Sequence, residues 1–303
     1  MLENRMLLGL GEGGLNSQEL RVSGLGDDTR VSAFVGDERP NPESIGRIYG
    51  LVDFERHRLD GHSPFNLVHW HKVEELAVGL NLAGKTIVDI GCNQGQVTSR
   101  LLNQGPGRVV AVDTCEKAIT LAKETYNDPR LEFSLNPGHN LPLDSGTVSA
   151  VFMTFTMNHM GSGLLEATLE EVARVMEDGA TLVITDYSED RLRYKYGQLF
   201  EGENVFNDFP ETWMLEQFAG LEKNGERAIV PVYYRHTNTI WRTLRGCGFE
   251  YADMIQPVPS IDLLRRSSEL KRYFDACMRR VTIYEATKKP DNECDEVAVD
   301  TIG

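Results

Sequence analysis

Short apolar runs alternate with helix-like segments through the middle of the chain. The runs are rich in β-branched residues and end at turn residues, whereas the segments between them repeat apolar residues every three or four positions. The expected strands are 86–90, 109–112, 131–135, 148–154 and 181–185, and the expected helices are 97–102, 116–125 and 164–176. Strands that alternate with helices indicate βαβ units, so the pattern predicts an α/β fold with a doubly wound, Rossmann-like sheet.

The flanking segments follow other patterns. Residues 45–84 repeat apolar positions at helical spacing on both sides of a turn at 60–64, which predicts two N-terminal helices. The last third is expected to add a helix, a strand, a charged helix and a final strand, at 239–244, 249–255, 261–280 and 281–286. The two late strands bring the expected sheet to seven. Segments 1–44 and 288–303 are polar or acidic, and we expect them to be flexible.

Composition narrows the possible partners. The 303 residues include 46 acidic and 31 basic side chains, for a formal net charge of -15. An acidic chain repels the phosphate backbone that dominates nucleic-acid affinity, so a nucleic-acid substrate is disfavoured and a small neutral or cationic substrate is easier to accommodate. The five cysteines are widely spaced without a C-x-x-C pair, which argues against disulfides and against a metal site.

Export and membrane signals are missing from the sequence pattern. The longest near-continuous apolar run, residues 150–157, is far shorter than a membrane span, and the first ten residues lack a basic region followed by an apolar core. We therefore expect a soluble cytoplasmic protein without a membrane partner.

The strongest local signal is a glycine-rich turn after the first expected strand. Residues 86–90 run directly into Gly91-Cys-Asn93-Gln-Gly95. Glycines without Cβ atoms let a ligand approach the main chain at the carboxyl end of a strand, where open α/β sheets bind ligands. A dinucleotide fingerprint G-x-G-x-x-G that begins at Gly91 would need glycine at Asn93 and Gln96, so the nicotinamide interpretation is weakened.

The same stretch resembles the first motif of class I S-adenosylmethionine-dependent methyltransferases, Asp-x-Gly-x-Gly-x-Gly. Asp89-Ile-Gly91-Cys-Asn93-Gln-Gly95 departs from it only at Asn93, and asparagine tolerates positive φ. The resemblance continues in order through four further segments, at 109–113, 141–144, 173–186 and 241–250. The chain is similar to small-molecule methyltransferases of type 11. The resemblance covers roughly residues 85–287.

This resemblance implies S-adenosylmethionine as the cofactor and names residues that would hold it. Asp113, at the end of the second strand, would accept the ribose hydroxyl protons, although an acid there can also cap a helix. Asp89 would reach the methionine end or only cap neighbouring amides. The family often has Gly-Asp where this chain has Asn136-Pro137, so Asn136 or nearby backbone would meet adenine. The candidate cofactor-binding residues are Asp89, Gly91, Cys92, Asn93, Gly95, Asp113, Thr114, Asn136, Thr154 and Trp70.

The catalytic candidates are histidines and a tyrosine. His159 follows the fourth strand, where the family often has polar residues that face the methyl acceptor, and a neutral imidazole can take a proton at neutral pH. A hydrogen-bonded structural histidine is an equally good interpretation. Tyr187, His236 and His71 are the further candidates. His69 and His71 point apart on a helix, so no metal pair is expected.

The aromatic-rich segment 188–236 matches the place where the family inserts a lid over the acceptor. Aromatic side chains there would suit a planar or cationic acceptor, or would form a small core of their own. The resemblance therefore predicts methyl transfer to an O, N or C nucleophile of a small metabolite. Two alternatives stay open: a methyltransferase for RNA or protein, since the Gly-Cys-Asn-x-Gly wording also occurs in RNA 5′-phosphate methyltransferases, and a cofactor-binding protein without methyl transfer. The oligomeric state is left open.

Overall fold

The computed structural model describes residues 64–188, 211–223, 226–258 and 281–290, together with Glu43, Ile45, Gly46, Tyr49 and Arg265. For 64–68 and 211–231 the backbone alone is described. The predictions of flexible termini, of a first N-terminal helix before residue 60 and of a helix over 261–280 lie largely or wholly outside the described residues, as do the aromatic residues of 194–209. No helix within the described part of the chain is long and apolar enough to cross a membrane.

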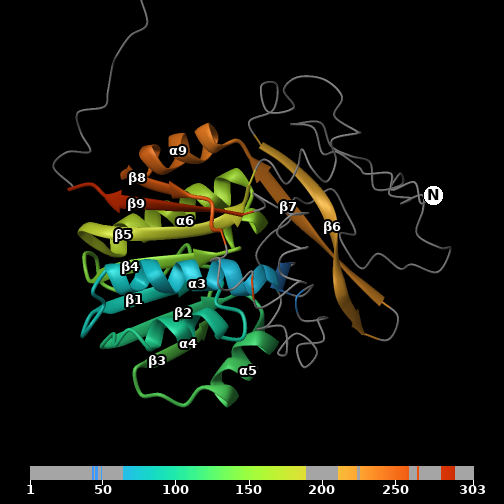
Figure 1. Ribbon diagram of the computed structural model, residues 1–303, viewed down its shortest axis with the longest axis horizontal. Coiled ribbons are helices and arrows are strands. Elements are labelled where there is room, and N and C mark those ends of the chain that lie inside the picture. Colours follow the sequence, from blue (N-terminus) through green and yellow to red (C-terminus); the bar gives the residue numbers. More distant parts are fainter. Residues whose placement is uncertain are drawn as a thin grey trace, which may run out of the picture.

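A seven-stranded sheet forms the centre of the molecule (Figure 1), with the strand order β3-β2-β1-β4-β5-β9-β8. The strands are β1 (Thr86–Ile90), β2 (Arg108–Asp113), β3 (Leu131–Leu135), β4 (Val148–Thr154), β5 (Met176–Tyr187), β8 (Phe249–Ile255) and β9 (Val281–Lys288). The first five are parallel in space, and β9 runs antiparallel to both of its neighbours. The predicted seven-stranded α/β sheet is confirmed.

Helices cover both faces of this sheet, as the alternation of its side chains requires. On one face lie α3 (Pro64–Gly79), α4 (Gln96–Leu102) and α5 (Glu116–Thr125), and on the other lie α6 (Ser162–Val175) and α9 (Thr237–Gly246). Strand β2 shows the division: Val109 packs against α3 and α4, whereas its neighbour Val110 belongs to the cluster that contains α6 and α9. The sheet is therefore doubly wound, and its parallel strands all end at one edge.

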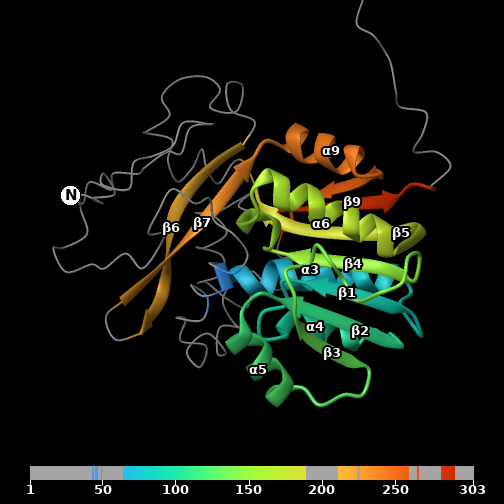
Figure 2. The ribbon, with the colours of Figure 1, turned by 180° about the vertical axis from the view of Figure 1, so that it is seen from behind.

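Two features differ from the pattern expected from the sequence. Helix α6 ends at Val175, so Met176, which the periodicity assigns to the helix, begins β5 and pairs with Val148. The aromatic-rich insertion contains a second, two-stranded sheet of β6 (Glu211–Lys223) and β7 (Glu226–Arg235). Figures 1 and 2 both show this hairpin beside the edge where the parallel strands end. Its role as a lid stays a prediction.

Candidate active site

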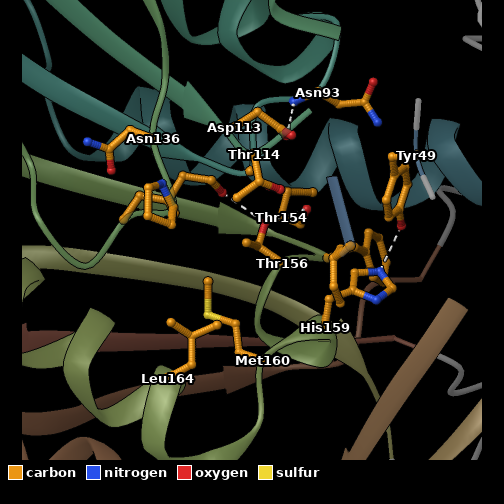
Figure 3. A pocket seen from close by; sticks show the side chains of 15 residues that line it. Tyr49, Asn93, Asp113, Thr114, Asn136, Thr154, Thr156, His159, Met160 and Leu164 are labelled. Atoms are coloured by element: carbon orange, nitrogen blue, oxygen red, sulfur yellow. Dashed lines mark hydrogen bonds between the residues drawn. The ribbon is translucent and has the colours of Figure 1, made fainter. Parts of the chain in front are cut away.

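A pocket opens at the carboxyl ends of β1, β2 and β4 (Figure 3). Its walls come from the turns that follow these strands, from the residues after β3, and from Ile45 and Tyr49 in the N-terminal segment. Seven residues proposed from the sequence line it: Gly91, Asn93, Asp113, Thr114, Asn136, Thr154 and His159. Parallel strands bring residues that are far apart in the chain to this one edge, which is why the candidates meet.

The turn after β1 is compact because Gly91, Asn93 and Gly95 all adopt positive φ. Gly91 has φ 76° and its amide donates to the Val112 carbonyl at 2.8 Å. A Cβ on Gly91 would lie 2.0 Å from the Thr156 hydroxyl, which itself donates to the Ile90 carbonyl at 2.8 Å. Asn93 has φ 51°, so the expectation that asparagine replaces a glycine here is confirmed.

Asp113 ties this turn to the start of α5. Its Oδ2 accepts the Asn93 amide and its Oδ1 accepts the Cys115 amide, each at 2.8 Å. Burial raises the pKa of the Asp113 carboxyl, and the amide hydrogen bonds oppose this shift. The carboxylate thus orders both turns, and because it also lines the pocket its remaining lone pairs can meet a ligand.

Asp89 is buried under the same turn. Thr98 donates to its Oδ2 at 2.6 Å, while Oδ1 has no hydrogen-bond partner among the described residues. Burial raises the pKa of Asp89 to about 7, against the Thr98 hydrogen bond that lowers it. A buried oxygen without a donor costs free energy, so Oδ1 is a ready acceptor for a cationic or N–H group.

The turn after β3 forms another wall of the pocket. The Asn136 amide side chain donates to the Asn140 carbonyl and accepts from the Gly138 amide, both at 2.8 Å. These bonds use its side chain to shape the turn. Contact between Asn136 and adenine stays a prediction, and the backbone of the turn and Pro137, which also lines the pocket, offer the alternative surface.

His159 lies in the short 3-10 turn Met157–His159 that follows β4. Its Nε2 is 2.8 Å from the Tyr49 hydroxyl, and the two rings meet edge to face. Arg235, buried at the end of β7, donates to the carbonyls of Met157 and Met160. The turn that carries His159 is therefore held from two sides.

Four proposed cofactor residues lie outside the pocket lining: Asp89, which is buried beneath the turn after β1, Cys92, Gly95 and Trp70. Cys92 is buried in the cluster of α5 with β2 and β3. A Cβ on Gly95 would meet the Phe133 and Tyr126 rings at 3.0 Å, so close ring contact and its φ of 83° at the start of α4 account for this glycine. Trp70 packs on the α3 side of the sheet, with the Arg100 guanidinium over its ring.

Three proposed catalytic residues also do not line the pocket. His71 is exposed on α3 and pairs with Glu75, whose carboxylate is 3.2 Å from its Nε2. His236 caps α9, because its Nδ1 accepts the Asn238 amide at 3.1 Å. Tyr187 lies directly behind the pocket wall, with its ring 5.1 Å from that of Phe155. Of the four catalytic candidates, His159 alone faces the pocket in the described structure.

Several lining residues were missed from the sequence. Phe155 has φ 53°, a rare conformation for a bulky side chain that no local pattern predicts. Tyr49 comes from a segment 110 residues away from His159, and the helical spacing around it carries no sign of this contact. The other missed residues are Ile45, Ile90, Pro137, Thr156, Met160 and Leu164.

Comparison with known sequences finds a family profile that matches the central region. A family profile described as "Methyltransferase domain" matches residues 87–179. An uncharacterized 37.1 kDa protein of transposon TN4556 from Streptomyces fradiae is 28% identical over 119 residues, which cover 38% of this chain and 34% of that protein. The chain thus matches only about a third of that relative's length.

Relatives with assigned names differ in their acceptors. The O-methyltransferase cnsE of Penicillium expansum is 22% identical over 195 residues, 56% of this chain and 69% of that protein. The tRNA U34 carboxymethyltransferase of Desulfotalea psychrophila is 29% identical over 121 residues, 38% of this chain and 36% of that protein. The matches therefore share a domain and not one kind of substrate.

Solved structures share the fold. A putative S-adenosylmethionine-dependent methyltransferase from Listeria monocytogenes superimposes with a TM-score of 0.57 at 18% identity, over 71% of this chain and 96% of that one. Magnesium protoporphyrin IX methyltransferase from Synechocystis, solved with S-adenosylhomocysteine, gives 0.54 at 17% identity, over 82% of this chain and all of that one. Residues 87–179 thus match the methyltransferase-domain family profile, and the chain has the fold of class I, S-adenosylmethionine-dependent methyltransferases.

Proposed function

We propose that this protein is a cytoplasmic enzyme that transfers a methyl group from S-adenosylmethionine to an O, N or C atom of a small metabolite. The observation that carries the proposal is a single pocket lined both by the Gly91–Asp113 turns and by His159. The two turns suit a bound nucleoside, and His159 can act as a proton acceptor. Class I methyltransferases of the same fold provide the precedent for the cofactor.

The residues present fit this cofactor. The Asp113 carboxylate can accept the ribose hydroxyl protons while it keeps its amide bonds to the turns. Gly91 lines the same pocket, and because Thr156 fills the space where a Cβ would lie, the turn can hold this close position only with glycine. Beneath the turn, the buried Oδ1 of Asp89, without a hydrogen-bond partner among the described residues, suits the ammonium group at the methionine end.

For methyl transfer, the protein mainly has to align the nucleophile with the methyl group and to remove the nucleophile's proton. Bound S-adenosylmethionine supplies an electrophilic methyl group on a sulfonium, so catalysis consists largely of holding the nucleophile in line with it. Phe155, Met160 and Leu164 give that part of the pocket an apolar wall that limits water. His159 is the proposed general base, because among the catalytic candidates it is the one that lines the pocket.

The acceptor is proposed to be a small neutral or cationic molecule. The formal net charge of -15 opposes binding of a polyanion, which would need a local basic surface. The named relatives include an O-methyltransferase and a tRNA-modifying enzyme, so kinship alone does not choose between small and large acceptors. Charge is the property that favours the small one.

Methyl-labelled S-adenosylmethionine tests this function directly. The purified protein is incubated with the label and with a cell extract separated into small-metabolite, protein and nucleic-acid fractions. We expect label in the small-metabolite fraction alone. Label in RNA or protein would contradict the acceptor class, and tight cofactor binding with label in no fraction would sink methyl transfer itself.

A further inference from the structure

We propose that Glu171 of α6 is a positioning residue for the nucleoside end of the cofactor, and that it acts by fixing the peptide group between Asn140 and Leu141. This inference rests on the proposed function, in which the turn after β3 meets the nucleobase. Glu171 itself is not part of the pocket lining, so it would act on the ligand without touching it. Its effect would pass through the turn.

Two charged residues of α6 hold the second half of this turn by its backbone. The Glu171 carboxylate accepts the Leu141 amide at 2.6 Å. Arg174 donates to both Glu171 oxygens at 2.7 Å. The same guanidinium donates to the carbonyls of Leu141 and Leu143, at 3.4 and 3.0 Å. The backbone at 141–143 is therefore bonded to the helix through one acidic and one basic side chain.

The Glu171 carboxylate is shielded from solvent and charged. Its side chain is 12% exposed, whereas that of Arg174 is 39% exposed. The hydrogen bonds from Arg174 hold the pKa of Glu171 below its usual value against the opposing effect of burial, and the Leu141 amide adds to this lowering. A charged acceptor makes a stronger hydrogen bond than a neutral one. Glu171 therefore holds the Leu141 N–H more firmly than an uncharged side chain would.

The peptide group that Glu171 binds is also held at its other end. Its N–H belongs to Leu141 and its carbonyl to Asn140, and this carbonyl accepts from the Asn136 side-chain nitrogen at 2.8 Å. Carboxylate, peptide group and amide side chain thus form one chain of hydrogen bonds. Because each bond in such a chain polarises the next, the charge on Glu171 strengthens the bond between the Asn140 carbonyl and Asn136.

Asn136 extends this chain of hydrogen bonds to the pocket. Asn136 and Pro137 both line the pocket, and Figure 3 shows Asn136 at its wall. The Asn136 Oδ1 accepts the Gly138 amide at 2.8 Å, and its backbone amide donates to the Asp113 carbonyl at 2.9 Å. The orientation of the Asn136 side chain therefore sets where Pro137 and Gly138 lie, in the turn where the nucleobase is proposed to bind.

Calorimetric titration tests whether Glu171 positions the nucleoside site. The probes are S-adenosylmethionine and 5′-methylthioadenosine, which keeps the nucleoside and lacks the amino-acid end. We expect Glu171→Ala to raise the Kd of both probes by about 3- to 30-fold, the range for residues that act without touching a ligand. Glu171→Gln keeps a neutral acceptor oxygen and should raise Kd less. Because the titrations use folded protein, a loss of stability alone would leave Kd unchanged.

The control is Glu170→Ala, which removes an exposed carboxylate one position away on α6 and should bind both probes as the wild type does. Two results would overturn the inference. One is an affinity of Glu171→Ala for both probes equal to that of the wild type. The other is a loss of affinity for S-adenosylmethionine alone, which would place the effect at the amino-acid end of the cofactor.

A double variant tests the path from Glu171 to the pocket. Because Glu171 and Asn136 bind the two ends of one peptide group, their effects on Kd should not be independent. We expect Glu171→Ala to raise Kd by a smaller factor in an Asn136→Ala protein than in the wild type. The same factor in both proteins would refute the path through Asn136.

Amide hydrogen exchange tests the fixed turn without any ligand. We expect the amides of Leu141 and Gly138 to exchange faster in Glu171→Ala, beyond any change at Phe152 inside β4. Unchanged exchange at Gly138 would mean that the effect stops before the pocket, and would contradict the inference. If the wild-type protein binds neither probe while exchange behaves as expected, the proposed function fails and the fixed turn stands.

Discussion

Gly91 and Gly146 both hold positive φ, at 76° and 65°, but they differ in what surrounds them. A Cβ on Gly91 would lie 2.0 Å from the Thr156 hydroxyl, whereas a Cβ on Gly146 would meet nothing within 4 Å. A substitution at Gly146 therefore introduces backbone strain alone, whereas one at Gly91 adds crowding. Gly146 is the control for Gly91.

We expect Gly146→Ala to lower the free energy of unfolding by about 1 to 2 kcal/mol, the cost of a left-handed conformation alone. Gly91→Ala should lower it by at least about 1 kcal/mol more, because Thr156 must move and its bond to the Ile90 carbonyl is lost. Urea denaturation of the two variants measures the difference. Equal losses of unfolding free energy in the two variants would show that the turn after β1 can accommodate a Cβ at Gly91, contrary to the structure.

Asp89 predicts a pH dependence of stability. Its pKa rises from 3.8 to about 7 through burial, so between these values the folded protein holds a proton that the unfolded chain has released. Stability from this group is therefore present below about pH 4 and is lost as pH rises to 7, by up to about 4 kcal/mol. Asp89→Asn should remove this dependence and be the more stable protein at pH 8.

Urea denaturation at pH 5 and pH 8 tests the Asp89 prediction. The wild-type protein should lose more stability than Asp89→Asn between these two values. Asp144→Asn, on an exposed carboxyl, controls for the loss of a negative charge and should follow the wild type. Parallel curves for Asp89→Asn and the wild type would contradict the assigned cause.

Single residues differ in how far the sequence could predict them. Asn93 and Asp113 were predicted because each follows a recognisable strand and carries a side chain suited to its turn. Tyr49 and Phe155 were not, because their places depend on a contact between distant segments and on one strained backbone angle. The local sequence pattern indicates which residues suit a turn. It does not indicate which side chains from distant segments come into contact.

Elements follow the same division. The strands 86–90, 131–135 and 148–154 were predicted with the bounds that the structure shows, because buried strands between glycine-rich or polar turns are distinctive. The hairpin of β6 and β7 was not predicted. Its aromatic residues lack a steady period of two, and Pro231 lies inside β7, where a proline argues against a strand in the sequence. The Asn224-Gly225 dipeptide between the strands is the sequence signal that could have revealed it.

Arg235 links this hairpin to the candidate active site. Its buried guanidinium donates to the Met157 and Met160 carbonyls, which frame the turn that carries His159. We expect Arg235→Met to lower the free energy of unfolding by about 2 to 4 kcal/mol, since hydrogen bonds from a charged donor are lost and the carbonyls stay buried. Arg242→Met, on an exposed position of α9, is the matched control.

Hydrogen exchange localises the effect of Arg235. The amides of His159 and Met160 close this turn with bonds of 3.0 Å to Thr156 and Met157, so they should exchange faster in Arg235→Met. The amide of Phe152, inside β4, should lose only what global stability loses. Unchanged exchange at His159 and Met160 would mean that the hairpin does not hold the turn.

At the scale of the whole molecule, the doubly wound sheet explains why one edge can hold both a nucleoside and a methyl acceptor. The parallel strands end together, and their turns supply Asp113 and His159 to one pocket. The formal net charge of -15 over the whole chain disfavours polyanions and favours neutral or cationic ligands. The charge thus favours the proposed small acceptor, and the fold and the pocket are compatible with the cofactor.

The central claim is that this edge binds S-adenosylmethionine through Asp113. Calorimetric titration of the cofactor into the wild-type protein, Asp113→Ala and the exposed control Asp144→Ala tests it most directly. We predict saturable binding to the wild type and the control, and binding at least about tenfold weaker to Asp113→Ala, since hydrogen bonds to a charged acceptor contribute about 1.5 to 3 kcal/mol. Equal affinity of Asp113→Ala and the wild type would contradict the account.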